Sequence, residues 1–483
     1  MWSGINMLVT KLGGIAITVV VVRIISPHDF GVFAAALIVH TIVSSCAELG
    51  VSSCVARRDL RLEDTAPTVA AVSLITGTLF AAIVFGLAAP IAALLGAPDA
   101  EGPIQVLAIC VLLTGLFAVP GAMMTRDFRQ DRLFLANLIA FVPANGLLIL
   151  LAIGGDGAMA FAWSRVVGQI CVGLVTLYSA KRHFWPRIDK VQILPILKFG
   201  LPLAGANLIN YTLLNADFAF IGRILGPALL GVYVLAFNVA SWSSSVLGST
   251  INSVAMSAFS ESGADPDHLR DKLARWARLT ALVACPLAAM TTILSTDIVI
   301  GLYGEKWVGA GEILAVLAVY GALFTTSLLL SNLLVATGQS WRVLLIQVAW
   351  LSTLVPTMWI SVSTFGVLGA AWAHVFVIGC IVLPSYLWAL RSVVPNLAGL
   401  LGRATGGPAI ASIAAAVAAA MATIPITGAW WRIGVASVVG LVVYLAAALP
   451  FAGGVLAMES DSKFGRYVAF TARLLAKTRR RTT

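Results

Sequence analysis

The sequence predicts an all-α polytopic membrane protein with about 14 transmembrane helices, from its composition, its apolar segments and its charge distribution. Of its 483 residues, 60% are hydrophobic and only 11% are charged. A soluble globular domain has about 45–50% apolar and about 25% charged residues. The composition therefore excludes a water-soluble enzyme, and it also excludes a disordered chain or a coiled coil, because both need many more charges.

Apolar windows of about 20 residues, the length that crosses a bilayer as a helix, recur between polar breaks. The breaks carry turn residues, as at Ser26-Pro27, Gly226-Pro227 and Thr337-Gly338. No ten-residue alternation indicates an outer-membrane barrel. The predicted helices span residues 5–25, 31–49, 66–89, 104–124, 133–153, 158–178, 196–221, 229–254, 279–302, 313–335, 341–362, 366–389, 408–425 and 430–451.

Basic residues fall almost entirely on one side of this predicted topology. Alternate connections and the C-terminal tail contain 24 of the 31 Lys and Arg residues, whereas the opposite connections contain only Arg223, Lys306 and Arg432. Cytoplasmic loops carry such an excess, so both termini are predicted to be cytoplasmic. The net charge of +10 then predicts anionic inner-leaflet lipids, and no nucleic acid, as the electrostatic partner.

Two further segments combine basic and apolar residues. The tail, 456–483, is either an interfacial segment held to anionic headgroups or a plain solvated basic tail. In the 257–278 connection, Asp265-Pro266 predicts the start of a helix.

The two halves of the chain resemble each other. Residues 23–36 align with 223–236 at an offset of 200, and residues 157–166 align with 366–375 at an offset of 209. An even number of helices per repeat gives parallel halves, as in some secondary transporters whose substrate site lies between the repeats. The predicted domains are two six-helix lobes around a central cavity, an appended helix pair and the basic tail, over 1–192, 193–390, 391–455 and 456–483.

Residues 23–31, Arg-Ile-Ile-Ser-Pro-His-Asp-Phe-Gly, are similar to the "aRlLsPedfG" signature of polysaccharide transporters. The similarity continues at 47–50, 216–226, 231–233 and 302–307, so it covers essentially residues 1–390. The chain thus resembles Wzx-type flippases of the multidrug/oligosaccharidyl-lipid/polysaccharide exporter superfamily.

This resemblance implies a bacterial inner-membrane protein that is not an enzyme. Its cargo would be a prenyl-diphosphate-linked oligosaccharide, moved from the cytoplasmic to the outer leaflet by alternating access for surface polysaccharide or lipopolysaccharide biosynthesis. The implied partners are glycosyltransferases and a polymerase of the same pathway, and the chain is expected to be a monomer. In related lipid II flippases the last two helices form a groove for the lipid tail, which makes residues 408–451 the corresponding candidate.

Charges inside predicted spans are candidates for cargo binding, because a charge at the bilayer centre costs about 2.5–3.5 kcal/mol on insertion scales. Arg165 lies about two turns inside its helix, and the repeat alignment places His374 at the equivalent position. Arg offers a planar fork suited to phosphate oxygens, and His changes charge near neutral pH. The alternatives are that Arg165 pairs with a carboxylate and that His374 is a packing residue.

Asn207, Asn210 and Asp217 form one polar stripe on their helix, which must face the cavity or another helix rather than lipid. Asp217 either takes a coupling proton or sodium ion or balances Arg165. Lys11 either snorkels to the interface or lines the cavity. Scattered cysteines without ligand spacing predict no metal site, and no cofactor is expected beyond a coupling ion.

Two other functional classes compete with the flippase. A cation-coupled drug antiporter of the same superfamily shares the predicted fold, but the basic Arg165 favours an anionic cargo. A membrane-embedded glycosyltransferase or polymerase needs acidic catalytic residues on sizeable outer loops. The longest outer connection here, near residues 303–312, has about ten residues and no DxD.

Overall fold

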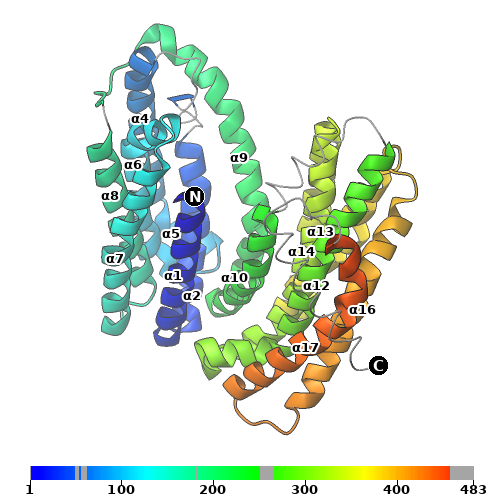
Figure 1. Cartoon of the computed structure of the whole chain (residues 1–483). Coiled ribbons are helices and arrows are strands. Elements are labelled where there is room, and N and C mark those ends of the chain that lie inside the picture. Colours follow the sequence, from blue (N-terminus) through cyan, green and yellow to red (C-terminus); the bar gives the residue numbers. More distant parts are fainter. Residues whose placement is uncertain (1, 49–53, 56–61, 181, 251–265, 457–483) are drawn as a thin grey trace, which may run out of the picture. The chain divides into compact units, whose positions relative to one another are not determined.

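The computed structural model describes residues 2–48, 54–55, 62–180, 182–250 and 266–456 (Figure 1). The described residues are helical apart from turns and short connections, and they include no strand. The predicted basic tail lies outside them apart from Leu456, as do Arg57, Arg58, Arg61 and Lys181.

Two compact units make up the chain. Unit 1 comprises Met1–Val234, Leu302–Trp307 and Val362–Val367. Unit 2 comprises Leu235–Gly301, Val308–Ser361 and Leu368–Thr483.

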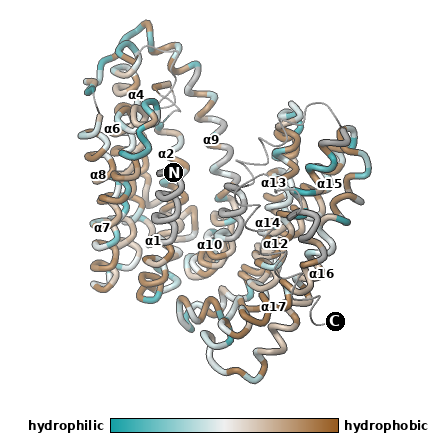
Figure 2. Tube along the Cα trace, viewed as in Figure 1, coloured by the Kyte–Doolittle hydropathy of each residue, from teal (hydrophilic) through white to brown (hydrophobic). Residues whose placement is uncertain are grey.

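Unit 1 is a bundle of apolar helices. They are α1 (Trp2–Ile24), α2 (Pro27–Ala47), α4 (Leu62–Gly86), α5 (Ala88–Leu94), a 3₁₀ turn (Pro98–Ala100), α6 (Glu101–Arg126), α7 (Gln130–Gly154), α8 (Ala158–Ser179), α9 (Lys190–Leu225) and the start of α10 (Pro227–Thr250). Hydrophobic residues run along most of each helix, and hydrophilic residues gather at helix ends and turns (Figure 2). This is the distribution expected of helices that cross a bilayer.

The start of α2 explains several residues of the transporter-like motif. Ser26 is the N-cap and accepts a hydrogen bond from the Asp29 backbone N–H at 3.1 Å, while its hydroxyl donates to the Asp29 carboxylate at 2.6 Å. Pro27 occupies the first helical turn, where its missing N–H costs no hydrogen bond. Together these residues fix where α2 begins and satisfy part of its free N-terminal backbone.

Gly31 of α2 and Gly231 of α10 let the backbones of these two helices touch. A Cβ on Gly31 would lie 1.7 Å from the Pro227 carbonyl oxygen, and a Cβ on Gly231 would lie 2.0 Å from that of Pro27. Real Cβ atoms essentially never come within 3.0 Å of such an atom. The contact therefore requires glycine on both helices, at the two positions that the repeat alignment pairs.

The segment Leu302–Trp307 caps the C-terminal end of α1. Lys306 Nζ donates to the carbonyls of Arg23 and Ile25 at 2.8 and 2.7 Å, and Arg23 Nε donates to the Leu302 carbonyl at 2.7 Å. The fully buried Trp307 donates its indole N–H to the Val22 carbonyl at 3.0 Å. These donors satisfy carbonyls that the end of a helix leaves without partners.

Unit 2 contains the remaining helices, apart from the end of α12 from Leu302 on and Val362–Val367 of α14. They are the rest of α10, α12 (Pro266–Tyr303), α13 (Gly309–Ala336), α14 (Ser340–Val377), a π turn (Ile378–Val382), α15 (Leu383–Leu390), α16 (Leu397–Thr423) and α17 (Ala429–Leu456). A 3₁₀ turn (Glu305–Trp307) between α12 and α13 belongs to unit 1. Pro266 is helical, but Asp265 lies outside the described residues, so the helix start predicted at Asp265-Pro266 stays a prediction.

Ser340–Leu390 is an apolar helical segment of 51 residues with a kink at Gly366. Gly366 has φ 64° and ψ −147°, so two helices meet there, where the sequence predicts the boundary between the spans 341–362 and 366–389. Ten described helices are long and apolar enough to span a membrane, and two shorter apolar helices cover Gly13–Ile24 and Pro227–Trp242. The total of 14 crossings and the parallel repeat remain predictions.

The appended pair, α16 and α17, packs against α12. The Tyr444 hydroxyl donates to the Leu282 carbonyl at 2.6 Å, and Arg432 Nη1 lies 3.2 Å from the largely buried carboxylate of Asp297. Alanines of α16 and Ala436 of α17 fill the contact between these bonds. The pair is therefore an integral part of unit 2.

Candidate functional site

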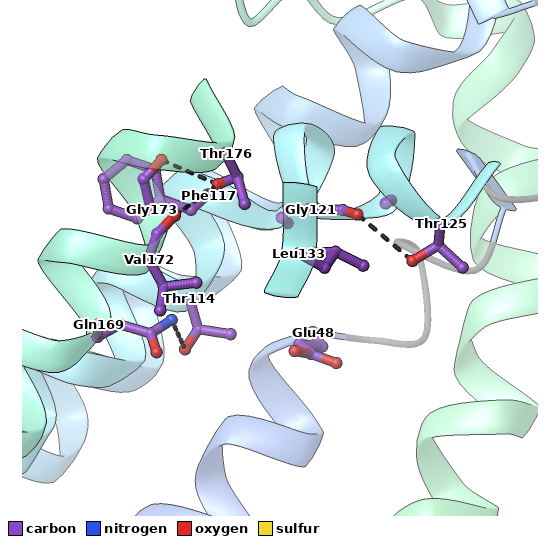
Figure 3. Close-up of a pocket in the computed structure, with 12 residues that line it drawn as sticks. Glu48, Thr114, Phe117, Gly121, Thr125, Leu133, Gln169, Val172, Gly173 and Thr176 are labelled. Atoms are coloured by element: carbon purple, nitrogen blue, oxygen red, sulfur yellow. Dashed lines mark hydrogen bonds between the residues drawn. The ribbon is translucent and has the colours of Figure 1, made fainter. Parts of the chain in front are cut away.

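A cavity of about 360 Å³ lies between α2, α6 and α8 in unit 1, with Leu133 of α7 at one edge (Figure 3). We call it the α2–α6–α8 cavity. Its other lining residues are Glu48, Thr114, Phe117, Ala118, Gly121, Ala122, Thr125, Gln169, Val172, Gly173 and Thr176.

Helical spacing brings polar residues of the three helices to this side. His40 and Ser44 of α2 and its C-cap residue Glu48 follow one another at intervals of four, and Ser44 Oγ lies 3.3 Å from His40 Nδ1. Residues four apart lie on the same face of a helix, one turn after another. The same spacing joins Arg165 to Gln169 on α8, so a row of polar groups extends beyond the cavity.

The cavity wall presents mainly hydrogen-bond acceptors. The hydroxyls of Thr125 and Thr176 donate to carbonyls of their own helices, to Gly121 at 3.5 Å and to Gly173 at 2.9 Å (Figure 3). A hydroxyl whose hydrogen is used in this way keeps its oxygen lone pairs for a ligand. Glu48 adds a half-buried carboxylate, which forms no hydrogen bond or ion pair with any described residue.

A hydrogen bond between Gln169 and Thr114 links the cavity walls formed by α8 and α6. Gln169 Nε2 donates to Thr114 Oγ1 at 3.5 Å (Figure 3). Thr114 Oγ1 donates in turn to the Cys110 carbonyl at 2.9 Å. The amide oxygen of Gln169 is a further acceptor. This link holds the amide in place between α6 and α8.

Phe117 supplies an aromatic surface in the same wall. Its ring packs directly on Gly173, where an added Cβ would lie 2.0 Å from a ring carbon. Gly173 thus provides the space that lets the ring lie between α6 and α8.

Arg165 lies one turn of α8 beyond Gln169, toward the start of the helix. It is exposed, and no described carboxylate lies within ion-pair distance of its guanidinium. His40 and Cys110 are close enough to interact with its charge, and His40 also hydrogen-bonds to the Leu107 backbone. The polar row therefore has a cationic end at Arg165 and an acidic end at Glu48.

His374 lies in unit 2, whereas Arg165 lies in unit 1. It is only 6% exposed, and its ring centroid lies 4.9 Å from that of Tyr320 and 6.1 Å from that of Phe237. An aromatic setting of this kind matches the packing alternative for His374.

The predicted stripe on α9 is divided. Asp217 is 3% exposed and accepts a hydrogen bond from the Tyr233 hydroxyl of α10 at 3.1 Å. The stripe was predicted to face either the cavity or another helix, and Asp217 faces another helix. Asn207 is half-buried. The side chains of Asn210 and Lys11 lie outside the described residues, although α9 and α1 include both positions.

Sequence reasoning missed the polar residues that line the cavity. His40 was predictable, because it is an ionisable residue inside an apolar span. Arg165 was selected for the same reason, since a charge inside the bilayer is costly. Glu48 was noticed only as part of a motif, and Thr114 and Gln169 carry no charge. Within the described part of the chain, no group of three His, Cys, Asp or Glu side chains could hold a metal ion.

Comparison with known proteins supports the same interpretation of the sequence. A family model described as "Polysaccharide biosynthesis protein" matches residues 20–312, more than half of the chain. This match includes α2, α6 and α8 and therefore the whole cavity.

Curated relatives are about a quarter identical to this chain over the residues that align. The lipopolysaccharide biosynthesis protein WzxC of Escherichia coli (strain K12) is 24% identical over 70% of this chain and 69% of its own length. The succinoglycan biosynthesis transport protein ExoT of Rhizobium meliloti (strain 1021) is 24% identical over 63% of this chain and 62% of its own. The teichuronic acid biosynthesis protein TuaB of Bacillus subtilis (strain 168) is 23% identical over 61% of each chain.

Solved structures establish the fold at low sequence identity. The lipid II flippase MurJ, in an inward closed conformation, superposes with a TM-score of 0.77 over 94% of this chain and 99% of its own, at 13% identity. An inward-facing multidrug resistance MATE family transporter of the MOP superfamily gives 0.63 over 83% and 98%, at 18% identity. The chain is a multi-span membrane protein with the fold of these transporters.

Proposed function

This chain belongs to the polysaccharide biosynthesis protein family, and on that premise we propose that it is a flippase for a prenyl-diphosphate-linked oligosaccharide. It moves this cargo from the cytoplasmic to the outer leaflet by alternating access, for assembly of a surface polysaccharide. The family match, the names of the relatives and the MurJ-like fold all support the proposal.

The observation that carries the proposal is the setting of Arg165. Arg165 is an exposed residue of an apolar helix, and its guanidinium has no carboxylate partner among the described residues. Inserting a cation into the bilayer costs free energy, so a cation inside a membrane span is a candidate for a functional role. A planar guanidinium binds phosphate oxygens through two parallel N–H donors, so Arg165 is assigned to the diphosphate of the cargo.

We place the protein in the bacterial cytoplasmic membrane with both termini in the cytoplasm. The strongly unequal distribution of basic residues between alternate connections supports this orientation. In that orientation α2 and α8 end at the cytoplasmic side, where Glu48 and Thr176 lie. The cavity then lies in the cytoplasmic half of unit 1, next to the leaflet from which the cargo is loaded.

Delivery of the lipid-linked glycan to the outer leaflet, measured in cells at matched protein abundance, tests the assignment. Arg165→Ala is expected to weaken cargo binding about 10- to 100-fold, because charge-assisted hydrogen bonds contribute about 1.5–3 kcal/mol each. Arg165→Lys is expected to restore only part of the activity, since the fork geometry is lost. Arg132→Ala, an exposed cation outside the cavity, serves as the control.

Parental export by a normally inserted Arg165→Ala variant would contradict the role of Arg165. Export of organic cations with no effect on the lipid-linked glycan would instead support the drug-antiporter alternative.

A further inference from the structure

We propose that the α2–α6–α8 cavity is a sugar subsite that selects the chemical class of the cargo. It accepts a sugar that presents hydroxyl or amino donors, and it disfavours a sugar that carries its own carboxylate, such as a uronic acid. The inference rests on the proposed flippase function and concerns the part of the cargo beyond the diphosphate.

The acceptors in the cavity wall are the first argument. Glu48 contributes two carboxylate oxygens without a described partner, and Gln169 contributes an amide oxygen. The hydroxyls of Thr125 and Thr176 already donate to helix carbonyls. A ligand that fills this space must supply donors, and each sugar hydroxyl or amino group supplies at least one.

The size and the aromatic wall are the second argument. A cavity of about 360 Å³ falls within the range of about 300–1,000 Å³ typical of small-molecule sites. Phe117 is held against Gly173 and forms part of the wall. An aromatic surface beside a few polar groups suits a sugar ring, whose C–H face is apolar and whose rim is polar.

The position of Arg165 is the third argument. Arg165 and Gln169 are one helical turn apart on α8, a rise of about 5–6 Å. A sugar is joined directly to the diphosphate in such a cargo. One molecule can therefore place its diphosphate at Arg165 and its first sugar against Gln169, Thr114 and Glu48.

Charge provides the selectivity. Among the described residues that line the cavity, Glu48 is the only charged one. A uronic acid would bring a second carboxylate beside that of Glu48 in a partly enclosed space, and two close carboxylates repel each other. A neutral or amino sugar has no such penalty.

Binding to the purified full-length protein by isothermal titration calorimetry tests the proposal with three probes. They are farnesyl diphosphate alone, the same lipid linked to glucose, and the same lipid linked to glucuronic acid. The parental protein is expected to bind the glucose probe about tenfold more tightly than farnesyl diphosphate, the factor expected from one charge-assisted hydrogen bond. The glucuronic acid probe is expected to gain nothing over the bare lipid.

Two pairs of variants locate the effect. Glu48→Gln should reduce the glucose advantage to less than threefold and should improve binding of the glucuronic acid probe, with Glu101→Gln, an exposed carboxylate on α6, as control. Gly173→Ala should displace Phe117 and also reduce the glucose advantage. Gly168→Ala is its control, because a Cβ there would lie 3.4 Å from that of Ala144.

The outcomes separate this inference from the proposed function. If Arg165→Ala weakens all three probes equally while Glu48→Gln leaves their ratios unchanged, the sugar subsite is wrong and the diphosphate assignment stands. A Glu48→Gln variant that alters only the sodium or pH dependence would also overturn the subsite, in favour of an ion site. If farnesyl diphosphate binds equally to the parental protein and to Arg165→Ala, the assignment of the diphosphate fails.

Discussion

Substitution of Gly31 by alanine tests whether the backbone contact between α2 and α10 is essential to unit 1. The added Cβ would lie 1.7 Å from the Pro227 carbonyl oxygen and 2.8 Å from the Gly231 backbone nitrogen. To reach 3.0 Å, the closest approach that real Cβ atoms make, the two backbones must separate by about 1.3 Å. Neither neighbouring atom belongs to a side chain that could rotate away.

The expected cost follows from that geometry. Overpacking in a well-packed interior costs about 1–3 kcal/mol, and a contact between two backbones should be near the upper end. Gly231→Ala strains the same crossing, with its Cβ 2.0 Å from the Pro27 carbonyl oxygen. Because both changes are relieved by one separation of the helices, the double variant should cost less than the sum of the single variants.

Thermal unfolding of the detergent-solubilised protein provides the measurement. Gly31→Ala and Gly231→Ala are each expected to lower the unfolding temperature by several degrees. Gly434→Ala is the control, because a Cβ there meets no atom within 4 Å and alanine favours a helix over glycine. An unchanged unfolding temperature for Gly31→Ala would refute the inference that this crossing requires glycine.

Three further predictions concern other parts of the chain. Asp297→Asn should loosen α17 from α12 and lower the free energy of unfolding by roughly 1–2 kcal/mol, less than for a fully buried ion pair because the Arg432 side chain is 41% exposed. A double-mutant cycle with Arg432→Met, measured by thermal unfolding, gives the coupling energy of the pair, and zero coupling would contradict the contact. Burial raises the pKa of Glu48, which follows the last residue of the Pro27–Ala47 span, above its ordinary 4.5. The folded state thus holds this proton more tightly, so the stability that Glu48 contributes is present below pH 4.5 and lost as pH rises through the raised pKa. The free energy of unfolding of Glu48→Gln, measured against pH, should lack this loss. Identical pH profiles for the parental protein and Glu48→Gln would contradict the raised pKa. Finally, a reporter fused after Thr483 should be active only in the cytoplasm, and activity on the outer face would exclude the predicted orientation.

Helices were predictable from the sequence because their signals are local. Ser26-Pro27 sets the start of α2 through one cap and one fixed φ. The sequence places the start of α2 four residues too late, at residue 31, because apolar windows ignore the polar first turn. The division at Gly366 was also predictable, and the non-helical φ and ψ of this residue kink the chain between two helices there.

The candidate site was only partly predictable, because it depends on three helices meeting. Arg165 was identified from its charge within an apolar segment, a property of one helix. Glu48, Thr114 and Gln169 become a site only when α2, α6 and α8 pack together, and no local pattern encodes that packing. The same limit holds for Asp217: the polar stripe on α9 predicted that its side chain lies on a polar face, but not that Tyr233 is its hydrogen-bond partner.

Translocation by the purified protein in liposomes tests the central claim most directly. The probe is a fluorescent short-chain prenyl-diphosphate-linked saccharide, and its transfer between leaflets is followed by quenching with an impermeant reductant. The parental protein is expected to accelerate transfer over protein-free liposomes, and Arg165→Ala is expected to lose most of that acceleration while Arg132→Ala keeps it. If the parental protein transfers this lipid no faster than empty liposomes but extrudes an organic cation, the flippase account is contradicted.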